Sequence, residues 1–214
     1  MELSCQMLLL TAVNYGSYYL HITKVKNNSD KYFDSRVRTQ KPFGLRTYVE
    51  PLSQGDITLK YNKGKGPYDS SLITIGKEMI DQWKVIISCL TAEHAGQTDK
   101  DGKKKILSSL DMLAPKEICT ETYMVVDSFP TEVEAYNLTT YLKTLFVRFL
   151  ISQLAATQHL SKDKFRLVPI QDFTSSSDID WKKPIEEIDK QLYNKYGLTD
   201  SDINFIESMI KPME

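Results

Sequence analysis

Paired carboxylates and lysines come nearest to a catalytic pattern in this sequence. Mg²⁺-dependent nucleases commonly place a Pro-Asp dipeptide ahead of a Glu-x-Lys triplet, so that carboxylates hold the metal beside a lysine. The sequence contains neither, and its nearest triplets are Asp-Gly-Lys at residues 101–103 and Asp-Trp-Lys at residues 180–182. We therefore assign no catalytic residue, and a restriction endonuclease or nuclease-associated domain with an unrecognised metal site stays open as an alternative.

Metal ligation by histidine or cysteine is not indicated either. The three histidines lie far apart and follow no His-Glu-x-x-His spacing. The three cysteines are also widely separated and form no Cys-x-x-Cys pair, which argues against a zinc site and a disulfide framework. The sequence therefore predicts no metal site, and its cysteine usage fits a reducing cytoplasm. These residues are His21, His94, His159, Cys5, Cys89 and Cys119.

Recognition chemistry remains, and it is concentrated in residues 31–65. This stretch has eight basic and three acidic residues, although the whole chain carries a net charge of −1. Lysine and arginine bind DNA phosphates, arginine also reads guanine edges, and asparagine reads adenine. The alternative is an ordinary solvated surface whose charges balance once the chain is folded. The candidate DNA-contacting residues are Arg36, Arg38, Lys41, Arg46, Lys60, Tyr61, Asn62, Lys63 and Lys65.

The elements that must position these side chains indicate an α+β fold. A capping box at Thr131 and Glu134 predicts the start of one long helix, whose apolar stripe runs from residue 133 to 154. A short helix is expected within residues 75–82, and Gly64 to Gly66 are expected to form a hairpin turn. Strands are expected at residues 57–61, 83–90, 119–129 and 165–168. The resulting prediction is a mixed, twisted β-sheet with packed helices and a C-terminal helical pair.

The C-terminal part of the chain is acidic and amphipathic. From residue 176 onward it has nine acidic residues against five lysines, and helices are expected near residues 184–196 and 199–210. We predict three parts: an N-terminal segment of unclear role (1–30), a recognition domain (31–173) and a helical extension (174–214). An apolar stripe on the last helix either packs on the chain's own body, which we favour, or docks on another protein as an interaction subunit. The stripe consists of Ile203, Ile206, Met209 and Ile210.

Composition places the chain among ordinary globular proteins. Hydrophobic residues make up 41% and charged residues 26% of its 214 residues. The apolar stretch at residues 7–13 is too short to span a bilayer, and no basic segment precedes it as in a signal peptide. Residues 91–105 are polar and lysine-rich, and they are expected to form a loop. We expect a cytoplasmic protein without membrane contact.

Several segments, taken in order, resemble one family of bacterial restriction–modification proteins. Residues 41–47 (KPFGLRT), preceded by Ser35, resemble the family's S-x-K-P-F-G-L-x-T entry. Further similar segments are LKYNKG at 59–64, KVIIS at 84–88, CTETYMV at 119–125, YLKTLFVRFL at 141–150, VPIQDF at 168–173 and the closing segment at 192–213. The family is that of type II adenine-specific DNA methyltransferases, and the similar region is their C-terminal target-recognition (TaqI-like specificity) domain.

The resemblance implies a sequence-specific DNA recognition module without a methyl-transfer site of its own. An N6-adenine methyltransferase needs a Gly-rich turn for its sulfonium cofactor and a D/N-P-P-Y loop for the flipped adenine. This chain has no Pro-Pro dipeptide, and no Gly-x-Gly follows a strand and opens a helix. We therefore expect S-adenosylmethionine only in a catalytic domain that is missing here, and no cofactor in this chain. The implied partners are double-stranded DNA and a methylase domain or subunit, in a parent system that is in some members fused to an endonuclease.

Overall fold

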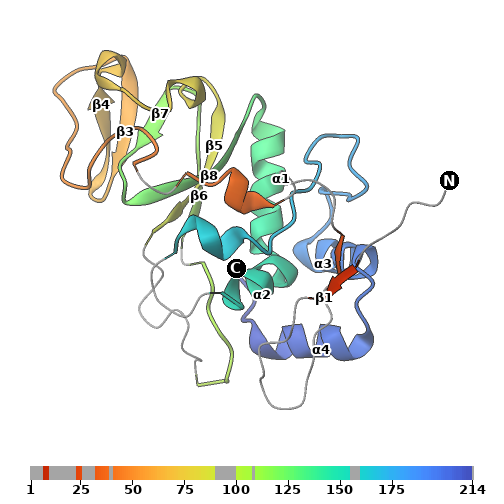
Figure 1. Ribbon diagram of the computed structural model, residues 1–214. Helices are drawn as coiled ribbons and strands as arrows, with labels where there is room; N and C mark the ends of the chain where they lie inside the picture. Colours follow the sequence, from red (N-terminus) through yellow and green to blue (C-terminus); the bar gives the residue numbers. More distant parts are fainter. Residues whose placement is uncertain are drawn as a thin grey trace.

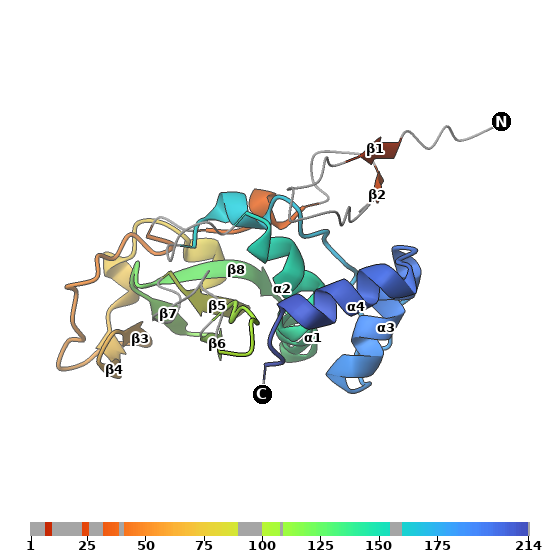
Figure 2. The same ribbon diagram turned by 90° about the horizontal axis from the view of Figure 1, so that it is seen from below.

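A computed structural model describes residues 7–9, 23–25, 32–38, 41–89, 100–107, 109–154 and 160–213. The described part combines helices with two three-stranded sheets, which confirms the predicted α+β class (Figure 1). The two three-stranded sheets occupy one end of the molecule, and helices α2 to α4 occupy the other, as Figures 1 and 2 both show. The expected loop at residues 91–105 lies mostly outside the described residues.

The first sheet is mixed and carries a hairpin, but its turn is at residues 62–63, whereas Gly64 to Gly66, the expected turn, are in strand β4. Strands β3 (Ile57–Tyr61) and β4 (Gly64–Tyr68) pair antiparallel, with Tyr61 opposite Gly64 and only two residues between them. Strand β7 (Glu117–Cys119) joins the other edge of β3 in parallel. Gly64 has a φ of +146°, which favours glycine at this turn.

The second sheet is antiparallel and has the predicted apolar strand at its centre. Strand β5 (Trp83–Ser88) lies between β6 (Leu110–Leu113) and β8 (Tyr123–Phe129). The single strand expected over residues 119–129 is instead two strands, β7 and β8, in different sheets. A turn closed by the Tyr123 N–H donating to the Thr120 carbonyl (3.1 Å) separates them. Both strands are apolar because both are buried, and the Thr-Glu-Thr sequence at residues 120–122 contains no glycine or proline that would mark the break.

Alternate side chains of the central strands enter two different hydrophobic cores. Ile86 and Val125 belong to the smaller core, which also contains residues of the β3–β4 hairpin and of η3 (Lys77–Met79). Val85, Met124 and Val126 belong to the larger core, which the helices complete. Because both faces of β5 and β8 are covered at their centres, residues 85–87 and 124–126 are continuously apolar.

The predicted long helix is two helices. Thr131 caps α1 (Glu132–Lys143) by accepting from the Glu134 N–H, as expected, and α2 (Leu145–Ser152) follows after Thr144. Thr144 adopts extended backbone angles (φ −62°, ψ 150°) and its side chain caps α2 by accepting from the Val147 N–H. The prediction of one continuous helix was therefore wrong at Thr144. The apolar stripe continues on both sides of the break, so it does not indicate where the first helix ends.

The predicted C-terminal pair is present as α3 (Ile185–Lys195) and α4 (Asp200–Met209). Their apolar residues pack on the chain's own larger core, and Ile206 and Ile210 are fully buried there. Thr199 and Asp202 form a capping box at the start of α4. None of the helices in the described part of the chain has the length and apolar character that crossing a bilayer requires.

A buried polar cluster joins α2 to the C-terminal pair. Both carboxylate oxygens of Asp189 on α3 accept backbone N–H groups at the start of α2, from Leu145 and Phe146 (2.9 Å each). Arg148 of α2 is also buried and donates to the carbonyl of Lys211, just after α4. Burial raises the pKa of Asp189 to about 6. These contacts tie the last two helices to the helix before them.

Short 3₁₀ helices complete the described structure. They are η1 (Phe33–Ser35), η2 (Ser70–Leu72), η3 and η4 (Lys162–Phe165). The short helix expected within residues 75–82 is η3, whereas the strand expected at residues 165–168 is absent because the chain turns after η4, with the Val168 N–H donating to Phe165 O. Near the N-terminus, β1 (Met7–Leu9) pairs antiparallel with β2 (Thr23–Val25).

Candidate nucleic-acid interface

The nine predicted DNA-contacting residues fall in different parts of the structure. Arg36 and Arg38 follow η1 and run beside β8, whereas residues 60–65 form the β3–β4 hairpin. Figures 1 and 2 show the hairpin at one end of the molecule and η1 over its central part, on a different side. Lys41 and Arg46 lie in the segment between them. The chain therefore presents these residues as separate groups.

The lysines of the hairpin are neutralised by carboxylates from other segments. Lys63 pairs with Glu50 (2.7 Å), and the hydrogen bond from Lys63 lowers the pKa of that carboxyl. Arg46 lies 3.7 Å from Glu121. The two remaining pairs are Lys60 with Asp111 (2.9 Å) and Lys65 with Glu117 (2.7 Å). Around the hairpin the charges balance in three dimensions, which is the alternative that the sequence left open. Tyr61 is half-buried there and Asn62 is exposed.

The segment after η1 is held firmly against the edge of β8. Phe33 is fully buried in the larger core, and its N–H donates to the carbonyl of Val168 (3.1 Å). Arg38 and Val125 exchange two backbone hydrogen bonds, of 2.8 and 3.0 Å. Arg36 donates to the Asp127 carboxylate (2.7 Å). The backbone of this segment is thereby fixed, while the Arg38 side chain stays exposed.

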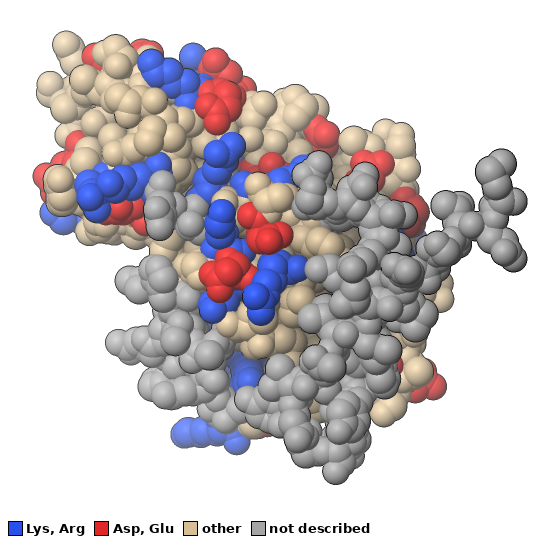
Figure 3. All heavy atoms as spheres, viewed as in Figure 1, with Lys and Arg blue, Asp and Glu red and all other residues tan. Residues whose placement is uncertain are grey.

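A second basic segment, which the sequence did not single out, lies against the first. Helix η4 packs against η1 and carries Lys162 and Lys164, and Arg166 follows it. Lys162 and Arg166 are exposed, and Lys164 lies 3.1 Å from Asp163. Phe165, fully buried, anchors the segment in the larger core. Figure 3 shows lysine and arginine side chains gathered in a band over the middle of this face, with acidic side chains among them.

We call the surface formed by the five cationic side chains of these two segments the basic face. It consists of Arg36, Arg38, Lys162, Lys164 and Arg166. Only the first two were predicted from the sequence. The alternating charges of residues 162–166 (Lys-Asp-Lys-Phe-Arg) were a usable signal, but they became relevant only because η4 packs on η1.

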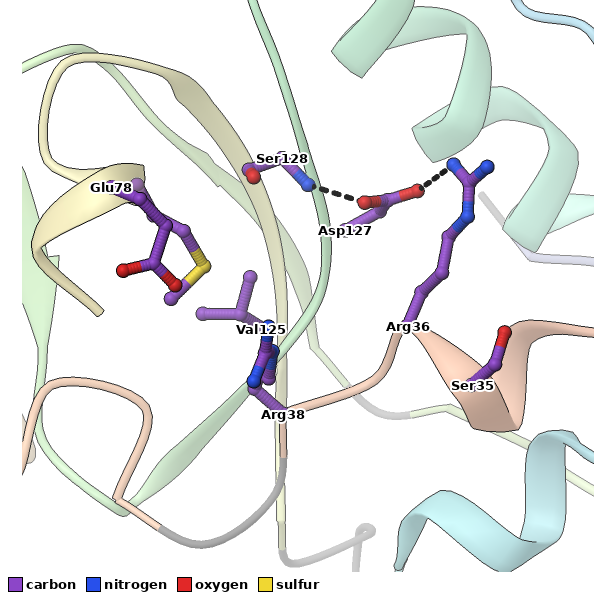
Figure 4. Close-up of a pocket in the computed structure, with 8 residues that line it drawn as sticks. Ser35, Arg36, Arg38, Glu78, Val125, Asp127 and Ser128 are labelled. Atoms are coloured by element: carbon purple, nitrogen blue, oxygen red, sulfur yellow. Dashed lines mark hydrogen bonds and ion pairs between the residues drawn. The ribbon is translucent and has the colours of Figure 1, made fainter. Parts of the chain in front are cut away.

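A polar hollow of about 240 Å³ opens beside the basic face (Figure 4). Its walls come from the segment after η1, from β8 and from η3. The Asp127 carboxylate bridges two of its wall residues, because it accepts from Arg36 and from the Ser128 N–H (2.8 Å). The lining residues are Ser35, Arg36, Arg38, Glu78, Met79, Val125, Asp127 and Ser128.

A buried lysine supports the η3 wall of this hollow. Lys84 on β5 is fully buried, and its ammonium donates to the carbonyls of Ile80, just after η3, and of Ala114 (3.1 and 3.0 Å). Burial lowers the pKa of Lys84 to about 8. The lysine therefore holds the end of η3 against the loop between β6 and β7.

The candidate groups for catalysis are scattered in the structure. The described residues include no group of three His, Cys, Asp or Glu side chains that could hold a metal ion. All three histidines and Cys5 lie outside the described residues. Cys89 and Cys119 are buried, and burial raises the pKa of Cys89 to about 11. In the triplet at 180–182, Trp181 is buried and donates to the Asp172 carbonyl, which is a packing role.

Comparison with known proteins gives no relative: no family model, curated protein or solved structure matches this chain.

Proposed function

We propose that this chain binds duplex DNA through its basic face. The observation that carries the proposal is the gathering of five cations, from two segments far apart in the sequence, on one side of the molecule. Arg38, Lys162 and Arg166 have no ion-pair partner within the described part of the chain. Unpaired surface cations are available to phosphates, whereas the paired lysines of the hairpin would first have to leave their carboxylates.

Electrostatics alone explains why such a face would suit a nucleic acid. A cation that neutralises a DNA phosphate releases condensed counterions, and this release drives binding at low salt. The net charge of −1 on the whole chain gives little long-range attraction, so a local concentration of cations has to supply it. Because the backbone of the segment after η1 is already fixed, binding through its arginines would lose little backbone conformational entropy.

The sequence resemblance supports a narrower version of this proposal. In it the chain is the target-recognition module of an N6-adenine DNA methyltransferase of a restriction–modification system, and its partners are double-stranded DNA and a methylase domain or subunit. Methyl transfer from S-adenosylmethionine would belong to that partner. Segment 84–88 of the resemblance is in β5, and segment 119–125 runs from β7 into β8, where its last residue, Val125, lines the polar hollow.

Duplex binding by the full chain tests the proposal. Fluorescence anisotropy with a labelled duplex of mixed sequence is expected to show binding that weakens as salt is raised. Each cation that contacts a phosphate contributes about 0.9 to the slope of log K against log salt. Lys162→Ala and Arg166→Ala are each expected to reduce that slope by roughly this amount.

A matched control separates the basic face from overall charge. Lys182→Ala, in the loop before α3, removes the same charge as Lys162→Ala and is expected to leave the slope unchanged. Lys63→Ala tests the hairpin in the same way, and we expect a smaller effect because Lys63 is already paired with Glu50. Equal losses from Lys162→Ala and Lys182→Ala would contradict binding at the basic face.

A further inference from the structure

The polar hollow contains two opposite charges that are not bonded to each other. Arg38 and Glu78 both line it, one from the segment beside β8 and the other from η3 (Figure 4). Within the described residues, neither side chain has an ion pair or a side-chain hydrogen bond. In Figure 4 the dashed lines join only Arg36, Asp127 and Ser128, and none reaches Arg38 or Glu78.

Both groups stand on backbone that is fixed. Arg38 is held by its two hydrogen bonds to Val125. Helix η3 directly follows Gly76, which has a φ of +72°. A Cβ at this position would lie 2.3 Å from the Pro42 carbonyl oxygen. The Lys84 ammonium then holds the other end of η3 through Ile80. The backbone positions from which the donor and the acceptor extend are therefore set before any ligand arrives.

The charges of the hollow argue against a bare anion as its ligand. Two arginines and two carboxylates line it, so its formal charge is zero, and a phosphate would approach Glu78 and Asp127 as well as the arginines. A ligand that fits has acceptors for Arg38 and a donor for Glu78. The edge of a guanine–cytosine pair in the major groove has both, because guanine presents O6 and N7 and cytosine presents its N4 amino group.

We propose that Arg38 and Glu78 read one guanine–cytosine pair of a DNA target, with Arg38 donating to guanine and Glu78 accepting from cytosine. Arg36 stays paired with Asp127 and forms the wall beside Arg38. The proposal rests on the proposed function, since it requires that duplex DNA reaches the basic face. It adds the chemistry of one base pair that the module selects.

Selection from a randomised duplex library tests this inference with the full chain. Bound duplexes are sequenced for the unchanged chain, for Glu78→Gln and for Arg38→Ala. The unchanged chain is expected to enrich a motif with a fixed guanine–cytosine pair. Arg38→Ala is expected to lose preference at that position alone by roughly 5- to 150-fold, which is the range for one bidentate base contact, and Glu78→Gln, which loses the charge but keeps an oxygen acceptor, by a smaller factor.

The outcomes separate this inference from the proposed function. Glu186→Gln, an exposed carboxylate on α3, is the matched control and is expected to enrich the same motif as the unchanged chain. If the unchanged chain enriches a motif and Glu78→Gln leaves every position of it intact, this inference is overturned while DNA binding stands. If the unchanged chain binds no duplex at low salt, both are overturned. Thermal melting of each variant confirms that the surface substitutions leave the fold in place.

Discussion

Replacing the buried lysine should make the folded chain more stable at neutral pH. Lys84 is fully buried on β5, and its ammonium has two carbonyl partners and no carboxylate within hydrogen-bond distance among the described residues. Lys84→Met keeps a side chain of similar length and removes the charge. Both carbonyls keep a backbone donor, because Ile80 O also accepts from the Lys116 N–H (2.8 Å) and Ala114 O from the Glu117 N–H (3.0 Å). The substitution therefore leaves no buried acceptor without a partner.

The magnitude follows from the pKa. Burial lowers the pKa of Lys84 from 10.5 to about 8, so the charged form is about 3 kcal/mol less favourable in the folded chain than in the unfolded chain. The two lost hydrogen bonds cost about 1 kcal/mol each. At about pH 7 the free energy of unfolding of Lys84→Met is therefore expected to exceed that of the unchanged chain by about 1 kcal/mol.

The pH dependence has a definite sign. Because the folded pKa lies below the unfolded one, the stability cost of ionised Lys84 is complete below the folded value of about 8 and disappears as the pH rises to 10.5. At about pH 10 the variant should therefore be the less stable form, since most of that cost has gone and the lost hydrogen bonds outweigh the rest. Urea denaturation followed by circular dichroism at both pH values measures the difference, and Lys77→Met on η3 is the exposed control. A loss of about 2 kcal/mol or more at neutral pH would refute the reasoning, as would a difference that does not change with pH.

Further predictions concern the elements around the site. Gly76→Ala should destabilise the fold by about 1–3 kcal/mol, because of the positive φ and the close Pro42 carbonyl; an unchanged melting temperature would mean that this backbone adapts. Asp189→Ala should lower the free energy of unfolding by about 2 kcal/mol or more at about pH 5, since the buried N–H of Phe146 and the partly buried N–H of Leu145 lose their acceptor. Burial raises the pKa of Asp189 from 3.8 to about 6, so the stability that Asp189 provides falls as the pH rises from 3.8 to about 6. The free energies of unfolding of the variant and the unchanged chain, measured by urea denaturation, should therefore lie closer together above about pH 6. Removal of residues 176–214 should abolish the cooperative thermal transition, because α3 and α4 bury residues of the larger core; a cooperative melt would show that the remainder folds alone.

Much of the fold was predictable because hydrophobic periodicity follows burial. The hairpin, β5, the cap of α1 and the C-terminal pair were all expected from local patterns, and the structure contains them. The breaks at Thr144 and at residues 120–122 were not expected, since the chain is apolar on both sides of each break. At the first break, Asp189 of α3 accepts from the N–H groups that open α2, and it lies more than 40 residues further along the chain, so no local pattern indicates this contact.

The candidate site was predictable only in part, because charge density along the chain does not show which charges meet in space. Lys63 and Lys65 looked like members of one basic stretch, yet Glu50 and Glu117 neutralise them in the folded chain. Arg38 keeps its charge unpaired because the strand beside it presents Val125 at that position. The cations of η4 join the site because η4 packs on η1, which lies more than 100 residues earlier in the sequence, and no local pattern indicates this contact.

The most direct test of the central claim is the salt dependence of duplex binding by the full chain and by Arg38→Ala. The account predicts measurable binding at low salt, a negative slope of log K against log salt, and weaker binding by Arg38→Ala than by the Lys182→Ala control. A folded, monodisperse sample that binds no duplex at low salt, or an Arg38→Ala variant that binds as tightly as the unchanged chain, would contradict it.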